Sequence, residues 1–341
     1  MADKLETYRA KRDATRTSEP VPVEGPLPRG EDDTFVIQEH HARSLHWDLR
    51  LERGGVLVSW AIPKGLPPDP ATNHLAVHTE DHPMEYARFE GEIPKGEYGG
   101  GTMTIWDRGH YATEKWSDRE VKIVLTGSRV AGRYVLFRTR GRNWMIHRMD
   151  PPSGRWEPPP ASLAPMTPVT RARVPRDPEA YAWEFWWGGA RALAYVEGGR
   201  LTLRDAGGAD VTGEHRWLRP LAEAFGSRAA VLDGEVVTFA GTAVYVAYDL
   251  LYDDGRSLLD EPFEWRRLGL EDLAVDGPRW QTAPSWPGEV DAVRRAAAEQ
   301  GLPGVVGKRL GSAYAPGEES PAWVRLPGNF FRLENPERED D

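Results

Sequence analysis

The first 150 residues alternate between apolar and polar positions in short runs, separated by turn-forming residues. A period of two places every second side chain on one face, which is typical of strands with one buried face. Eight short strands in about 120 residues predict an antiparallel barrel that is closed or nearly closed. The runs are FVIQEHH (35–41), SLHWDLRLE (44–52), GVLVSWAIP (55–63), HLAVHTE (74–80), GTMTIWDRG (101–109), VKIVLTG (121–127), RYVLFRTR (133–140) and NWMIHRMD (143–150).

The second half mixes strand-like runs with helical patterns, which predicts an α+β domain beside the barrel. Strands are expected at 191–196, 200–205, 229–239 and 243–252, and helices at 216–226 and 289–300. Between Asp150 and Pro165 six of sixteen residues are proline, a composition that favours an extended linker. We therefore predict four parts: a first domain (1–150), a linker (151–165), a second domain (166–327) and an acidic tail (328–341).

Composition narrows the class of protein. The 341 residues include no cysteine, so any metal must be bound by histidine and carboxylates. No apolar run reaches the roughly 18 residues that span a membrane, and the polar N-terminus MADKLETYRAKRD lacks the apolar core of a secretory leader. We therefore expect a soluble cytoplasmic protein with no membrane partner.

The net charge of −10 is unevenly distributed. Residues 1–150 carry 22 Lys and Arg against 23 Asp and Glu, and the remainder carries 21 against 30. Eight of the nine histidines fall in the first 150 residues. The acidic second half is thus a poor surface for a phosphate backbone, and contact of the first domain with DNA must rest on local clusters of charge.

The segment QEHHARSLHWDLRL (38–51) carries the strongest chemical pattern. In a strand, His46, Asp48 and Arg50 share one face, and the apolar residues between them face a core. HARS (41–44) is a plausible hairpin turn that returns Gln38 and His40 beside this row. Two imidazoles and a carboxylate suit Mn, Fe or Zn, and a guanidinium suits phosphate. The same alternation also fits an ordinary solvated strand face, but the second histidine across the turn favours a metal centre.

A second group of polar residues, HLAVHTEDHPMEY (74–86), places His78, Glu80 and His82 at alternate positions before Tyr86. A solvated strand face explains this group equally well. Lys64, in the loop AIPKGLP, can bring an ammonium to the same end of the predicted barrel. Together these are the parts of a metal-dependent phosphoester hydrolase, namely metal-activated water, basic phosphate contacts and an imidazole able to protonate a leaving oxygen.

Residues 8–150 resemble the 3′-phosphoesterase domain of bacterial DNA ligase D, an end-joining repair protein. The resemblance rests on YRAKRDATRTSEP, FVIQEHHARSLHWDLRLE, SWAIPKG, LAVHTEDHPMEYARFEGEIPKGEYGGGTMTIWDRG and NWMIHRMD, in that order. It implies a compact β-barrel that removes 3′-phosphates and 3′-terminal ribonucleotides from DNA ends, with Mn²⁺ or another divalent transition metal as cofactor.

The resemblance also assigns roles by position. One basic position of the family, just before LAVH, is His74 here, which is expected to weaken phosphate or DNA contact without affecting the metal. The metal ligands would be His40, His46 and Asp48. Catalytic or phosphate-binding residues would be Arg50, Lys64, His82 and Tyr86, with Arg12, Asp13, Glu19, Gln38 and Glu80 in support.

Residues 163–327 resemble the adenylating (nucleotidyltransferase) domain of ATP-dependent DNA ligases, again of the ligase D type. The retained landmarks are LDGE (232–235), YVAYDLLY (245–252), the arginine pair of PFEWRRLGL (262–270) before a helix, and VVGKRLGSAYAPGEESPAWVRL (305–326). We expect no OB-fold domain, which such ligases need to close on nicked DNA.

The positions that carry ligase chemistry are changed. The family motif E-x-K-W-D-G-x-R supplies a lysine that attacks the α-phosphate of ATP. In this sequence Trp186 stands at the lysine position and Gly188 at the aspartate position. The motif E-G-V-V reads Pro303-Gly304-Val305-Val306, and W-x-K-x-K reads WVRLP (323–327). An indole cannot attack phosphorus, so we predict a degenerate ligase domain that does not adenylate and for which ATP is not expected. Its remnant site would comprise Glu184, Trp186, Arg191, Glu235, Lys308 and Arg325.

The combined prediction is a nucleoid-associated DNA-repair enzyme that trims 3′ ends for a separate polymerase or ligase. Its partners would be DNA 3′ ends and a Ku-type end-binding protein. Two alternatives stay open: a repair scaffold without catalysis, and an ATP-dependent ligase with residual ATP binding. A phosphate-release assay separates the first alternative, and formation of a covalent AMP adduct separates the second.

Overall fold

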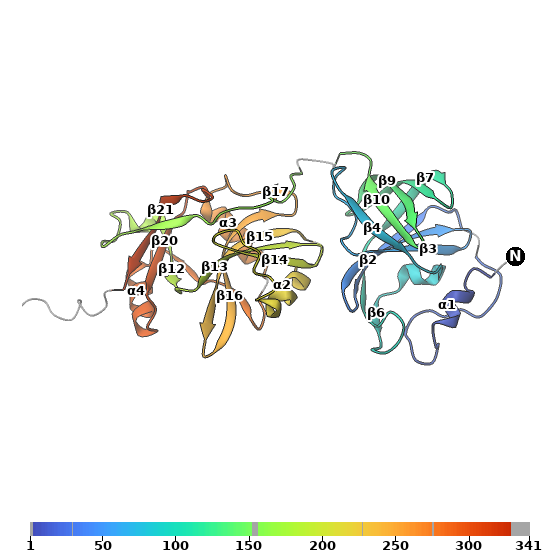
Figure 1. Ribbon diagram of the computed structural model, residues 1–341, viewed down its shortest axis with the longest axis horizontal. Helices are drawn as coiled ribbons and strands as arrows, with labels where there is room; N and C mark the ends of the chain where they lie inside the picture. Colours follow the sequence, from blue (N-terminus) through green and yellow to red (C-terminus); the bar gives the residue numbers. More distant parts are fainter. Residues whose placement is uncertain (1–2, 29, 152–155, 227, 275, 329–341) are drawn as a thin grey trace, which may run out of the picture. The chain divides into compact units, whose positions relative to one another are not determined.

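The computed structural model describes residues 3–28, 30–151, 156–226, 228–274 and 276–328. The chain divides into two compact units, Met1–Trp156 and Glu157–Asp341 (Figure 1). Part of the predicted linker (152–155) and, apart from Gly328, the predicted acidic tail lie outside the described residues. Among the residues described, no helix is long and apolar enough to cross a membrane.

The first unit is a closed antiparallel barrel. Its ring follows the order β1-β2-β3-β4-β10-β9-β8-β7, and pairing of β1 with β7 closes it. All eight predicted strands are confirmed, and the sequence patterns did not predict the short β5 and β6. The strands are β1 (Thr34–His41), β2 (Leu45–Arg53), β3 (Val56–Ile62), β4 (Asn73–His78), β5 (His82–Pro83), β6 (Gly91–Ile93), β7 (Gly101–Trp116), β8 (Glu120–Gly127), β9 (Ala131–Arg140) and β10 (Asn143–Arg148).

The two faces of β2 are buried against different partners. Trp47, Leu49 and Leu51 point into the barrel and join its apolar core, as the alternation predicted. The polar residues between them lie on the outer face, which is covered by the N-terminal helix α1 (Glu6–Ala10) and the 3₁₀ helix η1 (Met84–Arg88). Tyr8 and Tyr86 from these two segments are buried in that second cluster. The polar row is therefore enclosed, whereas a solvated strand face would be open to water.

The second unit contains two sheets and is of the α+β class, as predicted. One sheet has the order β11-β21-β20-β12-β19, and the other has the order β14-β13-β15-β16-β17, with β18 added beside β16. The strands are β11 (Thr167–Thr170), β12 (Tyr181–Trp186), β13 (Ala190–Glu197), β14 (Arg200–Asp205), β15 (Ala230–Phe239), β16 (Thr242–Asp253), β17 (Arg256–Ser257), β18 (Trp280–Thr282), β19 (Ser285–Pro287), β20 (Gly304–Arg309) and β21 (Glu319–Pro327).

The helices of the second unit differ in detail from the predicted ones. The predicted helix 216–226 is a 3₁₀ turn, η3 (Arg216–Leu218), followed by α2 (Arg219–Ala224), and the predicted helix 289–300 is α4 (Val290–Glu299). A further short 3₁₀ turn, η2 (Pro178–Ala180), directly precedes β12.

The arginine pair expected before a helix lies inside one, α3 (Phe263–Asp272). Arg266 of this pair is fully buried and donates two hydrogen bonds of 2.9 Å to Asp249. Its role in the fold is therefore an internal ion pair.

The second half of the predicted linker packs on the second unit. The amide of Glu157 donates to the Gly255 carbonyl at 2.7 Å, and the amide of Leu163 donates to the Tyr195 hydroxyl at 2.8 Å. Proline favours an extended backbone without forbidding such contacts, because the residues between the prolines keep their N–H donors. The chain from 157 onward is thus part of the second unit.

Candidate metal centre and second cleft

The predicted ligands converge on the outer face of the barrel. His40 on β1 pairs directly with His46 on β2, and Gln38 pairs with Asp48. One ligand atom from each of His40, His46 and Asp48 lies within 4.8 Å of the others. His40 Nδ1 is 3.7 Å from Asp48 Oδ2, and His46 Nε2 is 3.8 Å from Asp48 Oδ1. The turn after β1 therefore brings the three side chains together as the hairpin pattern predicted.

Backbone carbonyls orient both imidazoles. His40 Nε2 lies 2.8 Å from the Gly99 carbonyl, and His46 Nδ1 lies 3.0 Å from the Ser44 carbonyl. A carbonyl oxygen only accepts, so these two nitrogens carry the ring protons and donate. The lone pairs of His40 Nδ1 and His46 Nε2 then face Asp48. A ligating histidine is held in this way in many metal sites, so the donor set fits a divalent transition metal.

Asp48 and Arg50 form a buried ion pair behind the centre. Arg50 is 2% exposed and donates to Asp48 Oδ2 at 2.9 Å, to Gln38 Oε1 at 2.6 Å and to Ser59 Oγ at 3.0 Å. Burial acts to raise the pKa of Asp48, but the charge of Arg50, the largest opposing cause, brings it below its usual range. Asp48 is therefore a carboxylate throughout the physiological range, as a metal ligand must be.

Gln38 connects this ion pair to the segment that covers it. Its amide nitrogen donates to the carbonyls of Tyr86 and Phe89, at 3.1 and 2.8 Å. Ser59, which accepts from Arg50, was not singled out in the sequence. The signal available was a lone hydroxyl in the apolar strand VLVSWAI, on the face opposite the barrel core. Arg50 thus has protein partners on three donor atoms, and its influence on a phosphate would be mainly that of its charge.

His82 belongs to a second group of polar residues, which the N-terminal arm completes. Its Nδ1 donates to the Glu80 carbonyl at 2.9 Å, so Nε2 is the acceptor facing Arg12 Nη2, 3.4 Å away. Arg12 also binds Glu19 at 2.8 Å and the Glu80 carboxylate at 3.1 Å. The sequence analysis did not single out Tyr8. In the structure its ring lies 5.0 Å from that of His82, edge to face.

Burial controls the protonation of this group. Burial, followed by the charges of Arg50 and Arg12, lowers the pKa of His82 well below its usual value, so the ring is neutral at pH 7. Burial also raises the pKa of Tyr86, whose hydroxyl donates to Glu19 at 2.9 Å. For Glu80, burial acts to raise the pKa, but hydrogen bonds from Lys11 and Arg12 bring it below the usual value.

The remaining predicted residues lie elsewhere on the unit. Asp13 is exposed and accepts hydrogen bonds from Thr15, within its own turn. Lys64 is exposed on the loop after β3, next to the end of β2 that carries His46. His78 contacts the rings of Trp60 and Trp144 and is thus separated from Glu80 and His82, so the three do not form one row. β4 ends at His78, and the strand alternation on which that row depended ends with it.

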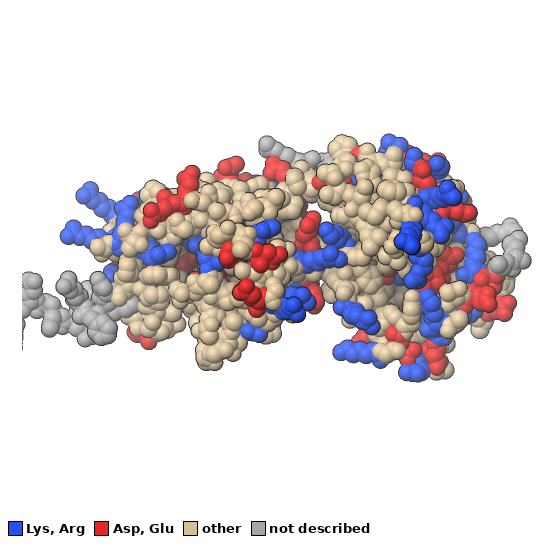
Figure 2. All heavy atoms as spheres, in the orientation of Figure 1, with Lys and Arg blue, Asp and Glu red and all other residues tan. Residues whose placement is uncertain are grey.

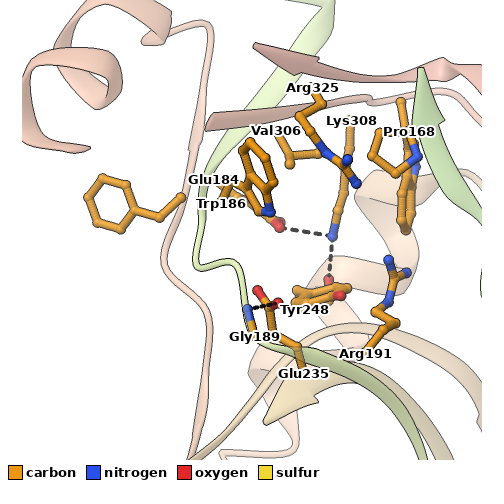
Figure 3. Close-up of a pocket in the computed structure, with 12 residues that line it drawn as sticks. Pro168, Glu184, Trp186, Gly189, Arg191, Glu235, Tyr248, Val306, Lys308 and Arg325 are labelled. Carbon is orange, nitrogen blue, oxygen red and sulfur yellow. Dashed lines mark hydrogen bonds and ion pairs between the residues drawn. The ribbon is translucent and has the colours of Figure 1, made fainter. Parts of the chain in front are cut away.

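The second cleft lies between the two sheets of the second unit and has a volume of about 110 Å³ (Figure 3). Lys308 is 1% exposed, and its ammonium lies 2.8 Å from Glu184 and 3.2 Å from the Tyr248 carbonyl. Burial lowers the pKa of Lys308, and Glu184 acts against that shift. On the opposite wall Glu235 accepts from the amide of Gly189 at 2.8 Å, and Arg191 donates to Asp233 at 2.7 Å.

The changed positions are neighbours in space. Trp186 on β12 pairs with Gly304 on β20, and Gly304 pairs in turn with Pro327 on β21. Arg325 stacks on the Trp186 indole, with its guanidinium 4.6 Å from a ring centroid (Figure 3). Gly188 has a φ of +72°, and a Cβ there would lie 3.2 Å from Pro303. The replaced residues thus gather at one end of the cleft, while Glu184, Lys308, Arg191 and Glu235 line the rest.

Comparison with known proteins identifies the family of each unit. Residues 38–138 match the family of the DNA Ligase D 3′-phosphoesterase domain, and residues 239–326 match the ATP dependent DNA ligase domain. The chain thus belongs to the ligase D type, with a 3′-phosphoesterase domain followed by an ATP-dependent ligase domain. This confirms the family resemblance on which the sequence prediction rested.

The relatives are end-joining proteins. The "Multifunctional non-homologous end joining protein LigD" of Mycolicibacterium smegmatis is 43% identical over 353 residues, which cover 95% of this chain and 46% of the relative. The protein of the same name from Pseudomonas aeruginosa is 32% identical over 397 residues, covering 94% and 47%. A solved structure, "mycobacterial DNA ligase D complexed with ATP and MES", is 32% identical and covers 48% of this chain and 60% of that chain, with a TM-score of 0.45. The chain spans about half the length of the curated relatives that it matches.

Proposed function

We propose that the first unit is a divalent-metal-dependent phosphoesterase that removes 3′-phosphates and 3′-ribonucleotides from DNA ends during end joining. The observation that carries this proposal is the orientation of His40 Nδ1 and His46 Nε2 toward Asp48, with their second nitrogens held by backbone carbonyls. His40, His46 and Asp48 would hold the ion, which when bound supplies a Lewis acid and an activated water. Mn²⁺ is the metal we propose.

The remaining residues of the site would position the phosphate. Lys64 is exposed, so its ammonium would be available to a phosphate directly. Arg50 would stabilise the anion through its charge while holding Asp48, because three of its donor atoms already have protein partners. Arg12 would contribute a second cation at the N-terminal side and is itself fixed by Glu19 and Glu80.

His82 is neutral in the free enzyme, and this defines the role we propose for it. In that state His82 Nε2 accepts a hydrogen bond and cannot donate a proton to a leaving group. A bound phosphate dianion would raise its pKa, because a nearby negative charge favours the charged imidazolium. We therefore propose that His82 becomes a hydrogen-bond donor or general acid only with substrate bound, and that Tyr86 supports it through ring contact at 4.8 Å.

We also propose that the second unit does not form a covalent adenylate. Trp186 offers no nucleophile, and the buried Lys308 is ion-paired with Glu184. A cleft of about 110 Å³ is also well below the roughly 300 Å³ at which small-molecule sites usually begin, so ATP is not proposed as a cofactor. This unit would serve as a folded scaffold in a protein whose partners are DNA ends and a Ku-type protein at the nucleoid.

The test of the phosphoesterase uses a primer-template with a 3′-phosphate and Mn²⁺. Wild type should release phosphate, and His46→Ala should lose nearly all activity because one ligand is removed. His110→Ala is the matched control, since that histidine is exposed and, among the residues described, its side chain pairs with Asp33 on the surface. Negligible release by wild type would refute the enzyme proposal and favour a scaffold. Equal release by wild type and His46→Ala would refute the metal centre.

A further inference from the structure

The interior of the barrel opens at one end into a cavity of about 360 Å³ that the proposed reaction does not use. Its walls include Trp60, Trp116 and Trp144, and its rim carries Arg138 and Arg142. Trp60 and Trp144 belong to the interior core, whereas the metal ligand Asp48 is on the outer face of the barrel wall. The cavity is thus separated from the metal centre by the sheet itself.

The rings in this cavity are already fixed against one another. The Trp60 ring lies 5.7 Å from that of Trp144 and 6.4 Å from that of Trp116, both edge to face. His78 stacks on Trp144, with ring centroids 6.1 Å apart and an angle of 28°. Trp60 and Trp144 are buried, whereas Trp116 is only half-buried and has the Arg53 guanidinium over its ring, 4.8 Å from a ring centroid. A flat ligand can therefore add to an ordered aromatic wall without a large loss of side-chain freedom.

The rim of the cavity is positively charged. The Arg142 guanidinium has no hydrogen bond or ion pair within the described part of the chain, and Arg138 bonds only the Gly141 carbonyl there, through Nε at 2.8 Å. Burial, followed by the charges of Arg138 and Arg142, lowers the pKa of His78, so that ring is neutral at pH 7. One acid, Asp118, also lines the cavity. Figure 2 shows a band of Lys and Arg across the first unit where β7 and β9 lie in Figure 1.

We propose that this cavity binds a nucleobase together with its phosphate. The base would lie against the half-buried ring of Trp116, and the phosphate would be held by Arg138 and Arg142 at the rim. Sites that bind single-stranded nucleotides combine aromatic side chains with cations. The rings stack on the π-face of the base, and the cations bind the phosphate. The volume also falls within the range of small-ligand sites, about 300–1,000 Å³. Binding here does not depend on catalysis at the metal centre.

The ligand can come from two sources, a free mononucleotide or an unpaired nucleotide of a strand. A labelled ten-residue oligothymidine would be titrated with the full chain in EDTA, with binding followed by fluorescence anisotropy, and dTMP would be used as competitor. Displacement by dTMP at concentrations near those of unlabelled oligothymidine identifies a free nucleotide as the ligand. Displacement by the strand alone identifies single-stranded DNA. Failure of wild type to bind either ligand would overturn the proposal.

Two variants locate the binding. The double change Arg138→Ala and Arg142→Ala should weaken binding about tenfold, because two phosphate contacts are lost. Arg108→Ala on β7 with Arg140→Ala on β9 is the charge-matched control, because both residues are exposed and neither lines the cavity. That control should change binding less than about twofold. Equal weakening by both pairs would show general attraction to charge and refute the site.

Trp116→Ala tests the stacking itself. It removes a half-buried ring without changing charge, and binding should weaken about fivefold or more. Circular dichroism and release of 3′-phosphate would show that the variant is folded. A folded Trp116→Ala protein that binds as well as wild type would refute the base-binding part of the proposal.

Discussion

The candidate metal centre and the second cleft both contain buried charged side chains but use them differently. In the candidate metal centre, backbone carbonyls accept hydrogen bonds from the ring N–H groups of His40 and His46, so the lone pairs beside Asp48 remain available. In the second cleft, the charges neutralise one another, with Lys308 paired to Glu184 and Arg191 to Asp233.

The difference teaches that charged residues in a cleft do not by themselves indicate a reactive site. What matters is whether donors and lone pairs are left for a ligand once the protein's own hydrogen bonds are formed. In the second cleft Arg325 stacks on Trp186, so this guanidinium also has a partner within the protein. Substitutions in the two sites should therefore have different consequences for activity and for stability.

Asp48→Asn should have the largest effect. It removes a metal ligand and leaves Arg50 buried without its carboxylate partner. Phosphate release should fall about 1,000-fold or more, and the free energy of unfolding should decrease by about 3 kcal/mol. Phosphate assays and urea denaturation measure the two effects. Asp33→Asn, at a surface pair with His110, is the control, and an Asp48→Asn protein with the same activity as that control would contradict the assignment.

Glu184→Gln tests whether the charges of the second cleft are structural. Lys308 would lose its buried ion-pair partner, and the free energy of unfolding should fall by about 3 kcal/mol. Phosphate release should be unchanged at temperatures where the protein is folded. Glu179→Gln, an exposed change just before the same strand, should alter stability by less than about 0.5 kcal/mol. Loss of phosphate release in folded Glu184→Gln would contradict the separation of the two sites.

The pH dependence of stability, the smallest of the three effects, tests the environment of His82. Its pKa in the folded protein is lowered, whereas in the unfolded chain it is about 6.5. Below that pH the unfolded state binds the extra proton, so wild type loses stability as the pH falls, by at most about 1.4 kcal/mol per unit for this group. Urea denaturation at pH 7, 6 and 5 should show a shallower decline for His82→Gln. Identical slopes would contradict a neutral, buried His82.

Local pattern was enough to predict the barrel and the convergence of His40, His46 and Asp48. Each barrel strand has one face in the core, so alternation located the strands, and the HARS turn fixed the pairing of His40 with His46. The contacts around His82 could not be read in the same way. Arg12 and Glu80 are 68 residues apart in the chain, and their ion pair depends on how the N-terminal arm folds over the barrel. Their assignment came from the family resemblance.

The sequence also could not predict which partners several of these side chains have in the folded protein. The pattern predicted Arg50 as a phosphate clamp, but Ser59 from the next strand and Gln38 engage its donors. It predicted His78 beside Glu80 and His82, but the end of β4 separates them. In the second unit the replaced lysine was evident from the motif, whereas the stacking of Arg325 on Trp186 required the register of β12, β20 and β21.

The central claim is that the first unit is catalytic and the second does not adenylate. One incubation tests both halves: the full chain with Mn²⁺, labelled ATP and a primer-template carrying a 3′-phosphate, scored for released phosphate and for AMP bound covalently to protein. We expect phosphate release without a labelled protein band. A labelled AMP-protein without phosphate release would contradict the account.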